Sequence, residues 1–600
     1  MSTLPIADYA FLSDCNSAAL VSTDGSVDWL AFPRFDAPSV LGRLLDPRAG
    51  HLRLGTTGPA RVTRRYLDGG LVLETTRRTD GGVLRITDAM ALGEGERGHD
   101  IGLSAPHALV RHATCESGRV EVELSYAPRP EYGLAVPLLR RTPHGIEVRG
   151  EADTLFLTTD LPMTVEGGVA TGRTTLRAGQ SVGVVLQWAA PGEVAPPWDA
   201  GEIARRIADT AEGWASWSAN HQSYQGPWRD LVRLSGAVLQ GLTFTRTGAI
   251  VAAPTTSLPE VVGGTRNWDY RYSWLRDASM TLDALWVAAC PDEAGQFVSW
   301  LVDAAAADLG GGRRIQIVYG LAGEHDLTER TLDHLAGWRD SRPVRIGNGA
   351  FAQRQLDVYG EVLNAVHRLR PQIFPTDPAT ATFLRGLADA AAQQWRDPDR
   401  GIWEVRGDPQ RFVHSAVMCW VALDRALRMA GELGAGADAR ARWLLERDSI
   451  MAEVLERGFN PARGAFTQSL DADTLDASAL LIPIVGFLPG RDPRVLSTIA
   501  AIEESLVDEH GLVYRYRSDD GLEGSEGAFV ICTFWLAHAH AAAGHVDRAR
   551  EVFARAIGLR NDLGLLAEER LGDQMLGNFP QAFSHIGLVN AAWAISQAER

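Results

Sequence analysis

The chain has 600 residues, of which 45% are hydrophobic and 22% are charged, and its formal net charge is −17. This length exceeds what one ordinary hydrophobic core supports, so we expect two or more domains or one very large architecture. The composition is typical of a soluble globular protein. The acidic charge argues against nucleic acid or an anionic membrane as a partner, because phosphate groups require a basic surface.

Targeting signals are not apparent. The first twenty residues contain no basic segment and no long apolar segment, so we predict no signal peptide. No run of about 18 apolar residues occurs, which predicts no membrane-spanning helix. The cysteines are odd in number and lack metal-type spacing, which favours buried thiols in a reducing compartment: Cys15, Cys115, Cys290, Cys419 and Cys532. We therefore expect a cytoplasmic protein that needs no metal or other cofactor.

The first third of the chain has the pattern of β-strands. In residues 119–130, Val120, Val122, Leu124 and Tyr126 alternate with polar residues, which is the period of a half-buried strand. Segments of similar length follow the same rule, with Gly- and Asp-containing turns between them: 71–79, 82–90, 153–161 and 181–189. Many short strands at close intervals predict an antiparallel β-sandwich over residues 1–195.

The pattern becomes helical after a Pro- and Gly-rich stretch at residues 190–202. We predict a linker with a helix over 196–228 and about twelve amphipathic helices over 229–600, the run from Val413 being typical. No motif repeats at a fixed period, so an (α/α)6 barrel of six helical hairpins is favoured over a solenoid. Its long loops should gather at one end and form a pocket: 250–272, 308–350, 396–411, 508–526 and 560–582.

One of these loops ends in "NWDYRYSWLRDAS", where aromatic rings occupy every second position. Such rings suit a ligand with an apolar face and a polar edge, as a pyranose has. Arg276 and Asp277 follow and could hold vicinal hydroxyls, since a guanidinium donates in a planar fork and a carboxylate accepts two hydrogen bonds. On the residues alone, core packing and a structural ion pair are equally good explanations.

Two other loops contain glutamates that could act as acids or bases. Glu404 directly follows Trp403, and a carboxyl group beside a large apolar ring has a raised pKa; the nearby Arg406 would oppose this. Glu568 and Glu569 are adjacent, so we expect one to face the pocket and the other the outside. A second carboxylate opposite the first is what a glycosidase needs, although a lone glutamate is more often an ordinary surface residue.

Five long blocks in this order resemble glycoside hydrolase family 15, the group of glucoamylases and bacterial trehalases. The blocks are "STDGSVDWLAFPRFDAPS", "NWDYRYSWLRDAS", "PVRIGNGAFAQRQLDVYGEVL", "GIWEVRG" with "RFVHSAVMCWVALDRA", and "LLAEE" with "LGNFPQAFSHIGL". The resemblance extends almost from end to end. It implies a β-sandwich packed on an (α/α)6 barrel, and hydrolysis of a terminal α-glucoside with inversion at the anomeric carbon.

The resemblance also implies roles for individual residues. Glu404 matches the general acid and Glu568 the general base, whose carboxyl groups stand roughly 6.5–9.5 Å apart in inverting enzymes. The residues expected to bind substrate are Tyr270, Trp274, Arg276, Asp277, Trp403, Arg515 and Trp338. Trp268 and Tyr272 are expected to be packing residues, and Trp29, Arg34 and Asp36 are candidates for a lip from the sandwich domain.

The favoured substrate is α,α-trehalose, because the amino-terminal block resembles the trehalase branch and no export signal or starch-binding appendage is seen. The alternative substrates are maltooligosaccharides or isomaltose. A disaccharide phosphorylase is disfavoured by the presence of Glu568, and a non-catalytic sugar-binding protein by the presence of both glutamates. The sequence makes no prediction about the oligomeric state.

Overall fold

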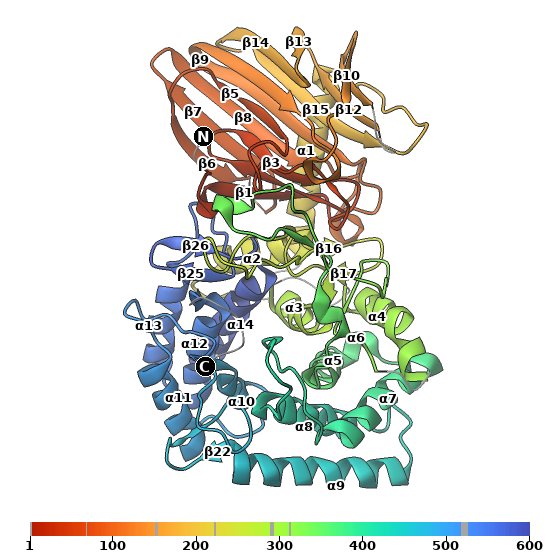
Figure 1. The fold of residues 1–600 in the computed structure, drawn as a ribbon, viewed down its shortest axis with the longest axis vertical. Helices are drawn as coiled ribbons and strands as arrows, with labels where there is room; N and C mark the ends of the chain where they lie inside the picture. Colours follow the sequence, from red (N-terminus) through yellow and green to blue (C-terminus); the bar gives the residue numbers. More distant parts are fainter. Residues whose placement is uncertain are drawn as a thin grey trace.

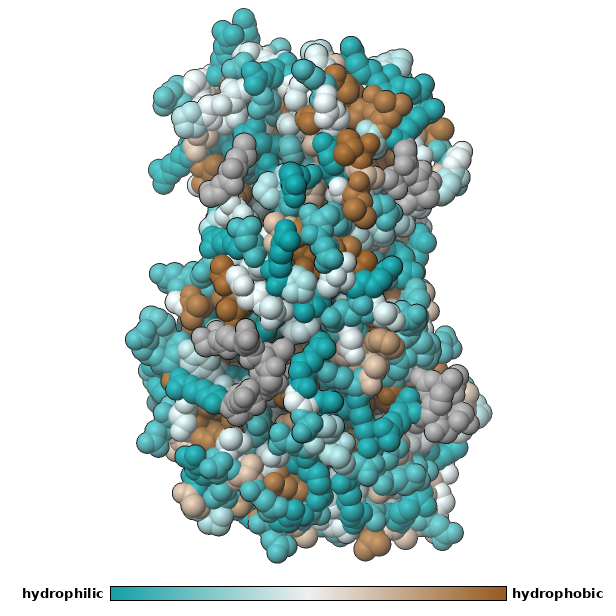
Figure 2. Space-filling view, viewed as in Figure 1, coloured by the Kyte–Doolittle hydropathy of each residue, from teal (hydrophilic) through white to brown (hydrophobic). Residues whose placement is uncertain are grey.

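The computed structural model describes residues 3–67, 69–149, 154–220, 224–288, 293–310, 314–517 and 526–600. A domain of β-strands at the amino-terminal end sits on a domain of helices (Figure 1). Hydrophilic residues cover most of the face in Figure 2, consistent with the high negative charge. None of the helices in the described ranges is long and apolar enough to cross a membrane.

The amino-terminal domain is antiparallel and is organised around one long strand, β9. Its first half pairs with β8 and β15, and its second half pairs with β5 and β14, so β9 belongs to two sheets. The predicted alternation is confirmed, because Val122, Leu124 and Tyr126 are fully buried while Glu121 is exposed. The strands are β1 Tyr9–Ser13, β2 Ala18–Ser22, β3 Ser26–Ala31, β4 Ser39–Leu41, β5 His51–Thr56, β6 Arg61–Tyr66, β7 Leu73–Thr79, β8 Gly82–Met90, β9 Ala108–Ala127, β10 Leu138–Thr142, β11 Gly145–Arg149, β12 Thr154–Thr159, β13 Met163–Glu166, β14 Val169–Arg177 and β15 Ser181–Ala189.

A long helix, α1 (Ala200–Asn220), follows the last strand. It packs against β8, β9 and β15 and also touches the first helix of the next domain. A helix was predicted in this linker, and the structure contains one. The domain limits at residues 195 and 229 stay predictions.

The helical domain is a double ring. The inner helices α3, α5, α8, α10, α12 and α14 each contact the next, and α14 closes the ring against α3. The outer helices α2, α4, α7, α9, α11 and α13 lie on this ring, which confirms the predicted (α/α)6 barrel. The bounds are α2 Arg229–Gly241, α3 Leu275–Ala288, α4 Glu293–Gly310, α5 Asp357–Arg368, α6 Arg370–Ile373, α7 Pro378–Gln394, α8 Val413–Arg428, α9 Ala437–Glu453, α10 Leu481–Ile484, α11 Pro493–Ser505, α12 Val530–Ala543, α13 Val546–Ile557 and α14 Ala582–Ala598.

Inner and outer helices differ in sequence for a physical reason. Most residues of α12 and α14 are buried, as expected of helices that are apolar all round.

Two outer helices, α7 and α11, begin with the same capping arrangement. Asp377 and Asp492 accept hydrogen bonds from the first free backbone N–H groups, and a proline follows each of them. This arrangement fixes where each helix starts.

Short two-residue and three-residue strands lie in the loops of the helical domain. They are β16 Thr243–Phe244, β17 Ala249–Ile250, β18 Ser273–Trp274, β19 Val318–Tyr319, β20 Arg330–Thr331, β21 Arg345–Ile346, β22 Phe459–Asn460, β23 Ala465–Phe466, β24 Ala528–Phe529, β25 Glu569–Leu571 and β26 Gln574–Leu576. They hold the loops that precede the inner helices at one end of the barrel.

The loop before α3 also joins the two domains. Arg271 forms a fully buried ion pair with Asp269. The Arg271 guanidinium donates to the carbonyl of Ala37 at 2.8 Å and to the hydroxyl of Tyr132 at 2.9 Å, both in the amino-terminal domain. A buried ion pair is tolerated only when its remaining donors find partners, and here the other domain supplies them.

Candidate active site

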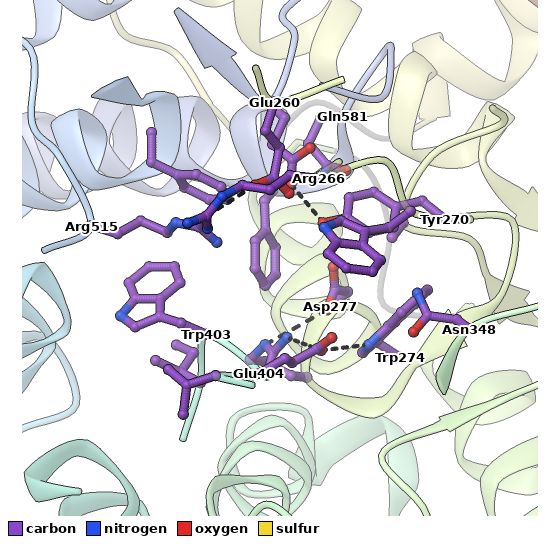
Figure 3. A pocket seen from close by; sticks show the side chains of 18 of the residues that line it. Glu260, Arg266, Tyr270, Trp274, Asp277, Asn348, Trp403, Glu404, Arg515 and Gln581 are labelled. Atoms are coloured by element: carbon purple, nitrogen blue, oxygen red, sulfur yellow. Dashed lines mark hydrogen bonds and ion pairs between the residues drawn. The ribbon is translucent and has the colours of Figure 1, made fainter. Parts of the chain in front are cut away.

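A cavity opens at the end of the barrel where the loops gather. Figure 3 shows Glu404 across the cavity from Glu260 and Gln581. The lining residues come from the predicted loops and the helix starts beside them: Ala252, Glu260, Arg266, Trp268, Tyr270, Trp274, Arg276, Asp277, Asn348, Ile402, Trp403, Glu404, Val405, Arg406, Arg515, Tyr516, Phe529, Glu568, Gln581 and Phe583.

Glu404 is held in an unusual backbone conformation. Its φ is +57°, a region that costs energy for a residue with a side chain and that is found at functional sites. The turn that contains it is closed by the Glu404 N–H, which donates to the carbonyl of Gly401 at 3.2 Å. Two donors point at its Oε1 atom: Trp274 Nε1 at 2.8 Å and Arg276 Nη2 at 3.3 Å. The side chain remains 23% exposed, so the carboxylate is oriented but still open to the cavity.

Glu568 lies in the loop immediately before β25 and is almost completely buried. Its Oε1 atom accepts a hydrogen bond from the hydroxyl of Tyr270 at 2.8 Å. Burial raises the pKa of Glu568 to about 7, opposed by the Tyr270 hydrogen bond and by the charge of Arg515. Gly577 passes so close that a Cβ there would lie 2.4 Å from Glu568 Oε2. A glycine is therefore needed at position 577, where φ is also +75°.

The helix that follows the Glu568 loop fixes its backbone. Ser584 donates to the carbonyl of Ala567 at 2.7 Å, and His585 Nε2 accepts from the N–H of Leu566 at 3.3 Å. Both side chains stand in the first turn of α14. The position of Glu568 is thus set by α14, and through it by the closure of the inner ring.

The expectation that Glu569 faces outward is wrong, because Glu569 is fully buried. It belongs to a group of three carboxylates, with Glu260 and Glu526, whose oxygens approach within 4.8 Å of one another. Such a group could hold a metal by spacing alone. However, Arg515 Nη2 forms ion pairs with all three carboxylates. The distances are 3.2 Å to Glu260, 2.5 Å to Glu526 and 3.7 Å to Glu569. A guanidinium at the centre of the group makes it a poor cation site, so we assign no metal to it.

The aromatic segment contributes three of its four rings to the cavity. Tyr270 and Trp274 line it as expected and contact each other edge to face at 5.5 Å. Trp268 also lines the cavity, which corrects its expected role as packing. Tyr272 is not among the lining residues, and its hydroxyl accepts from the N–H of Gly347 at 3.1 Å. Cavity and packing roles are therefore divided as predicted except at Trp268.

Arg276 and Asp277 lie in the first turn of α3, at the inner end of the cavity. Arg276 donates to Gln355 Oε1 at 2.9 Å and forms ion pairs with Asp357 at 3.5 Å and Glu404 at 3.3 Å. Asp277 Oδ2 is buried and accepts no hydrogen bond from any described residue. Burial raises the pKa of Asp277 to about 7, and the charge of Arg276 opposes this. Asp277 thus lines the cavity with a buried carboxyl group, and Arg276 Nε lies 3.8 Å from its Oδ2 atom.

Trp403 and Arg515 also line the cavity as expected. The indole Nε1 of Trp403 donates to both carboxylate oxygens of Asp476 at 3.0 Å. Arg515 lies 5.6 Å from the Trp403 ring centre and 4.8 Å from that of Phe529. These contacts fix the wall next to Glu404.

Other predicted site residues lie elsewhere. Trp338 is fully buried, and its indole donates to the carbonyl of Leu4 at 3.1 Å; it does not line the cavity, and its expected role as a substrate-binding residue is not supported by its position. Trp29 donates to the carbonyl of Pro254 at 2.8 Å, and Arg34 pairs with Asp36 and Glu324. Trp29, Arg34 and Asp36 therefore support loops of the helical domain instead of forming a lip.

Sequence reasoning missed several lining residues, notably Glu260, Arg266, Asn348, Tyr516 and Gln581. All of them lie in the loops predicted to form the pocket, and Asn348 and Gln581 lie within the blocks that resemble glycoside hydrolase family 15. Their polarity in loops rich in glycine was the available signal. Nothing in the local pattern distinguished Glu260 from the other acidic residues of the chain.

Comparison with known proteins agrees with this architecture. Residues 231–593 match the model of Glycosyl hydrolases family 15, and residues 1–212 match that of the Trehalase-like, N-terminal domain. The chain belongs to glycosyl hydrolases family 15. A crystal structure of a bacterial glucoamylase complexed with acarbose superposes with a TM-score of 0.72, covering 99% of this chain and 94% of that one, at 14% identity; this likeness supports the fold.

Among curated proteins, the chain is similar to several that are named trehalase. It is 42% identical to those of Mycolicibacterium smegmatis and Mycobacterium tuberculosis, covering 99% of this chain and 92% and 90% of theirs. It is 32% identical to that of Thermoplasma volcanium, covering 98% of this chain and 93% of that one.

Proposed function

We propose that the protein is an inverting, exo-acting α-glucoside hydrolase whose substrate is α,α-trehalose. The observation that carries this proposal is that Glu404 and Glu568, which are 164 positions apart in the sequence, line one cavity and are held there by different partners. Family membership and the similarity to proteins named trehalase over nearly the whole chain support the same conclusion.

Glu404 is the proposed general acid. Trp274 and Arg276 both donate to its Oε1 atom, so Oε2 is left to carry the proton to the glycosidic oxygen. Protonation of that oxygen allows the leaving sugar to depart as an alcohol.

Glu568 is the proposed general base. Its carboxylate takes a proton from a water molecule, whose oxygen then attacks the anomeric carbon from the face opposite the leaving sugar. The Tyr270 hydroxyl at 2.8 Å orients the carboxylate and stabilises its charged form. At the inner end, Asp277 and Arg276 are proposed to bind hydroxyl groups of the terminal glucose, with Trp274 and Tyr270 against its ring. The small-molecule partner is therefore an α-glucoside, and a cytoplasmic location remains a prediction.

The test is hydrolysis of trehalose followed by proton NMR of the first products. Inversion at one anomeric carbon predicts equal initial amounts of α-glucose and β-glucose, because the leaving glucose keeps its α configuration. Release of α-glucose alone would contradict inversion, and release of glucose 1-phosphate in phosphate buffer would show a phosphorylase. Faster turnover of maltose or isomaltose than of trehalose would favour the alternative, a glucoamylase-like α-glucosidase.

A further inference from the structure

The cavity has a buried end and an open end, and this gives a bound disaccharide a direction. The side chains of Arg276 and Asp277 are 7% and 5% exposed, that of Glu404 is 23% exposed, and that of Arg406 is 36% exposed. If Glu404 protonates the oxygen between two sugars, the terminal glucose lies toward Asp277 and the leaving sugar lies toward Arg406. This inference rests on the proposed function.

The open end contains an assembly that the proposed reaction has not used. The guanidinium carbons of Arg345 and Arg406 each lie 4.5 Å from the ring centre of Trp268. Glu329 joins the two arginines, with contacts of 3.0 Å to Arg345 and 3.7 Å to Arg406. Two cations against one indole form a stable stack when a carboxylate offsets their repulsion. The Trp268 ring is thus already in contact with protein, so it offers limited surface for stacking a sugar.

The two arginines differ in how many donors remain available. Arg345 is mostly buried and donates to the carbonyls of Thr265 and Asn267 at 2.8 and 2.9 Å, in addition to its pairing with Glu329. Among the described residues, Arg406 forms an ion pair with Glu329 alone. The 3.7 Å between Arg406 Nη2 and Glu329 Oε2 is too long for a hydrogen bond. Arg406 also lines the cavity, whereas Arg345 does not. Arg406 therefore has N–H groups that donate to no described residue, in a side chain that borders this cavity and also a neighbouring hollow lined by Gly349, Gln353 and Arg400.

We propose that Arg406, held against Trp268, binds hydroxyl groups of the leaving sugar and is a specificity-determining residue for a hydroxyl-rich leaving group. Arg345 and Glu329 act as positioning residues, because they fix the indole and the guanidinium plane. A planar fork of donors suits a pair of adjacent hydroxyls. The site would accordingly favour a sugar over an apolar leaving group at this position.

The experiment compares two substrates in wild-type protein and in Arg406→Ala. Trehalose has a leaving sugar, whereas α-glucosyl fluoride has only a fluoride ion in its place. Loss of a hydrogen bond from a charged donor predicts that kcat/KM for trehalose falls by about 10- to 100-fold, while kcat/KM for α-glucosyl fluoride changes by less than about twofold. Arg406→Lys, which keeps the charge but not the fork, should recover only part of the trehalose activity.

A matched control is Arg396→Ala, since Arg396 also stacks on an indole, at 4.0 Å from Trp395, and pairs with Glu446 outside the cavity. This variant should leave both substrates unchanged. Equal losses on trehalose and fluoride in Arg406→Ala, or no loss on either, would overturn the inference while leaving the hydrolase intact. If the wild-type protein hydrolyses neither substrate, the proposed function itself fails; calorimetric titration with trehalose then decides on Arg406, and unchanged affinity in Arg406→Ala would refute its role.

Discussion

The two catalytic candidates stand in opposite surroundings. Glu404 lies toward the open end in a strained turn, with an indole and a guanidinium directed at one of its oxygens. Glu568 is buried beside Tyr270 and a group of further carboxylates, with its pKa raised to about 7. A proton donor must reach a large substrate, whereas a base must hold one small water molecule. The difference in exposure matches this difference in task.

Replacing the base should have the largest effect. Glu568→Gln removes the group that accepts the proton of the attacking water, which every substrate needs, so kcat should fall by about 10⁴-fold on trehalose and on α-glucosyl fluoride alike. Single-turnover product formation measures this loss. A variant that kept its activity on either substrate would show that Glu568 is not the base.

Replacing the acid should depend on the leaving group, which sharpens the comparison. Glu404→Gln should lower kcat for trehalose by about 10³-fold, because a sugar alkoxide leaves poorly without a proton. Fluoride needs far less protonation, so α-glucosyl fluoride should lose much less. Parallel losses on both substrates would place Glu404 outside proton donation.

The pH dependence of activity should follow the ionisation of the buried carboxyl group of Glu568. Glu568 works as a base only when ionised, so kcat/KM should fall as the pH drops below about 7. The Tyr270 hydrogen bond favours the charged form, and Tyr270→Phe should therefore move the acidic limb to higher pH and lower kcat by about 10- to 100-fold. If the acidic limb did not move in Tyr270→Phe, the limb would report the ionisation of a group other than Glu568. The neighbouring carboxylates are candidates, because interacting carboxylates titrate together.

A small backbone change should separate the fold from the site. Gly577→Ala and Gly572→Ala both place a side chain at positive φ, at +75° and +56°, which costs about 1–2 kcal/mol. At position 572 the new methyl group meets nothing within 4 Å, whereas at 577 it meets Glu568. Thermal unfolding should show a larger loss of stability in Gly577→Ala than in Gly572→Ala, because only the first adds a clash, and activity should fall in Gly577→Ala alone. Equal activity in the two variants would mean that the Glu568 loop readily adapts.

Much of the fold followed from periodicity. The 82–90 and 181–189 strand segments coincide with β8 and β15, and the helical run predicted from Val413 is α8. Burial of the thiols is confirmed at Cys15, Cys115, Cys419 and Cys532, and Cys290 lies outside the described residues. What periodicity could not provide was the pairing of segments far apart in sequence, such as the two sheets that share β9.

The site was predictable where a residue's chemistry is local and not where it depends on neighbours. Tyr270, Trp274, Arg276 and Asp277 stand in one short segment, and all of them reach the cavity. Glu569 was misplaced because its burial depends on Arg515, which compensates three carboxylates from different loops. Trp338 was misplaced because its partner, the carbonyl of Leu4, lies 334 positions away near the amino terminus.

The alternation along residues 268–271 has a consequence for the enzyme as a whole. Trp268 and Tyr270 face the cavity, while Asp269 and Arg271 turn away and are anchored by Ala37 and Tyr132. Excising the β-domain would remove these anchors from a charged pair and would free the very stretch that carries the rings. The β-domain is therefore a structural component of the catalytic apparatus. Replacing it with another domain would also require a change in the loop of residues 268–271 that it holds in place.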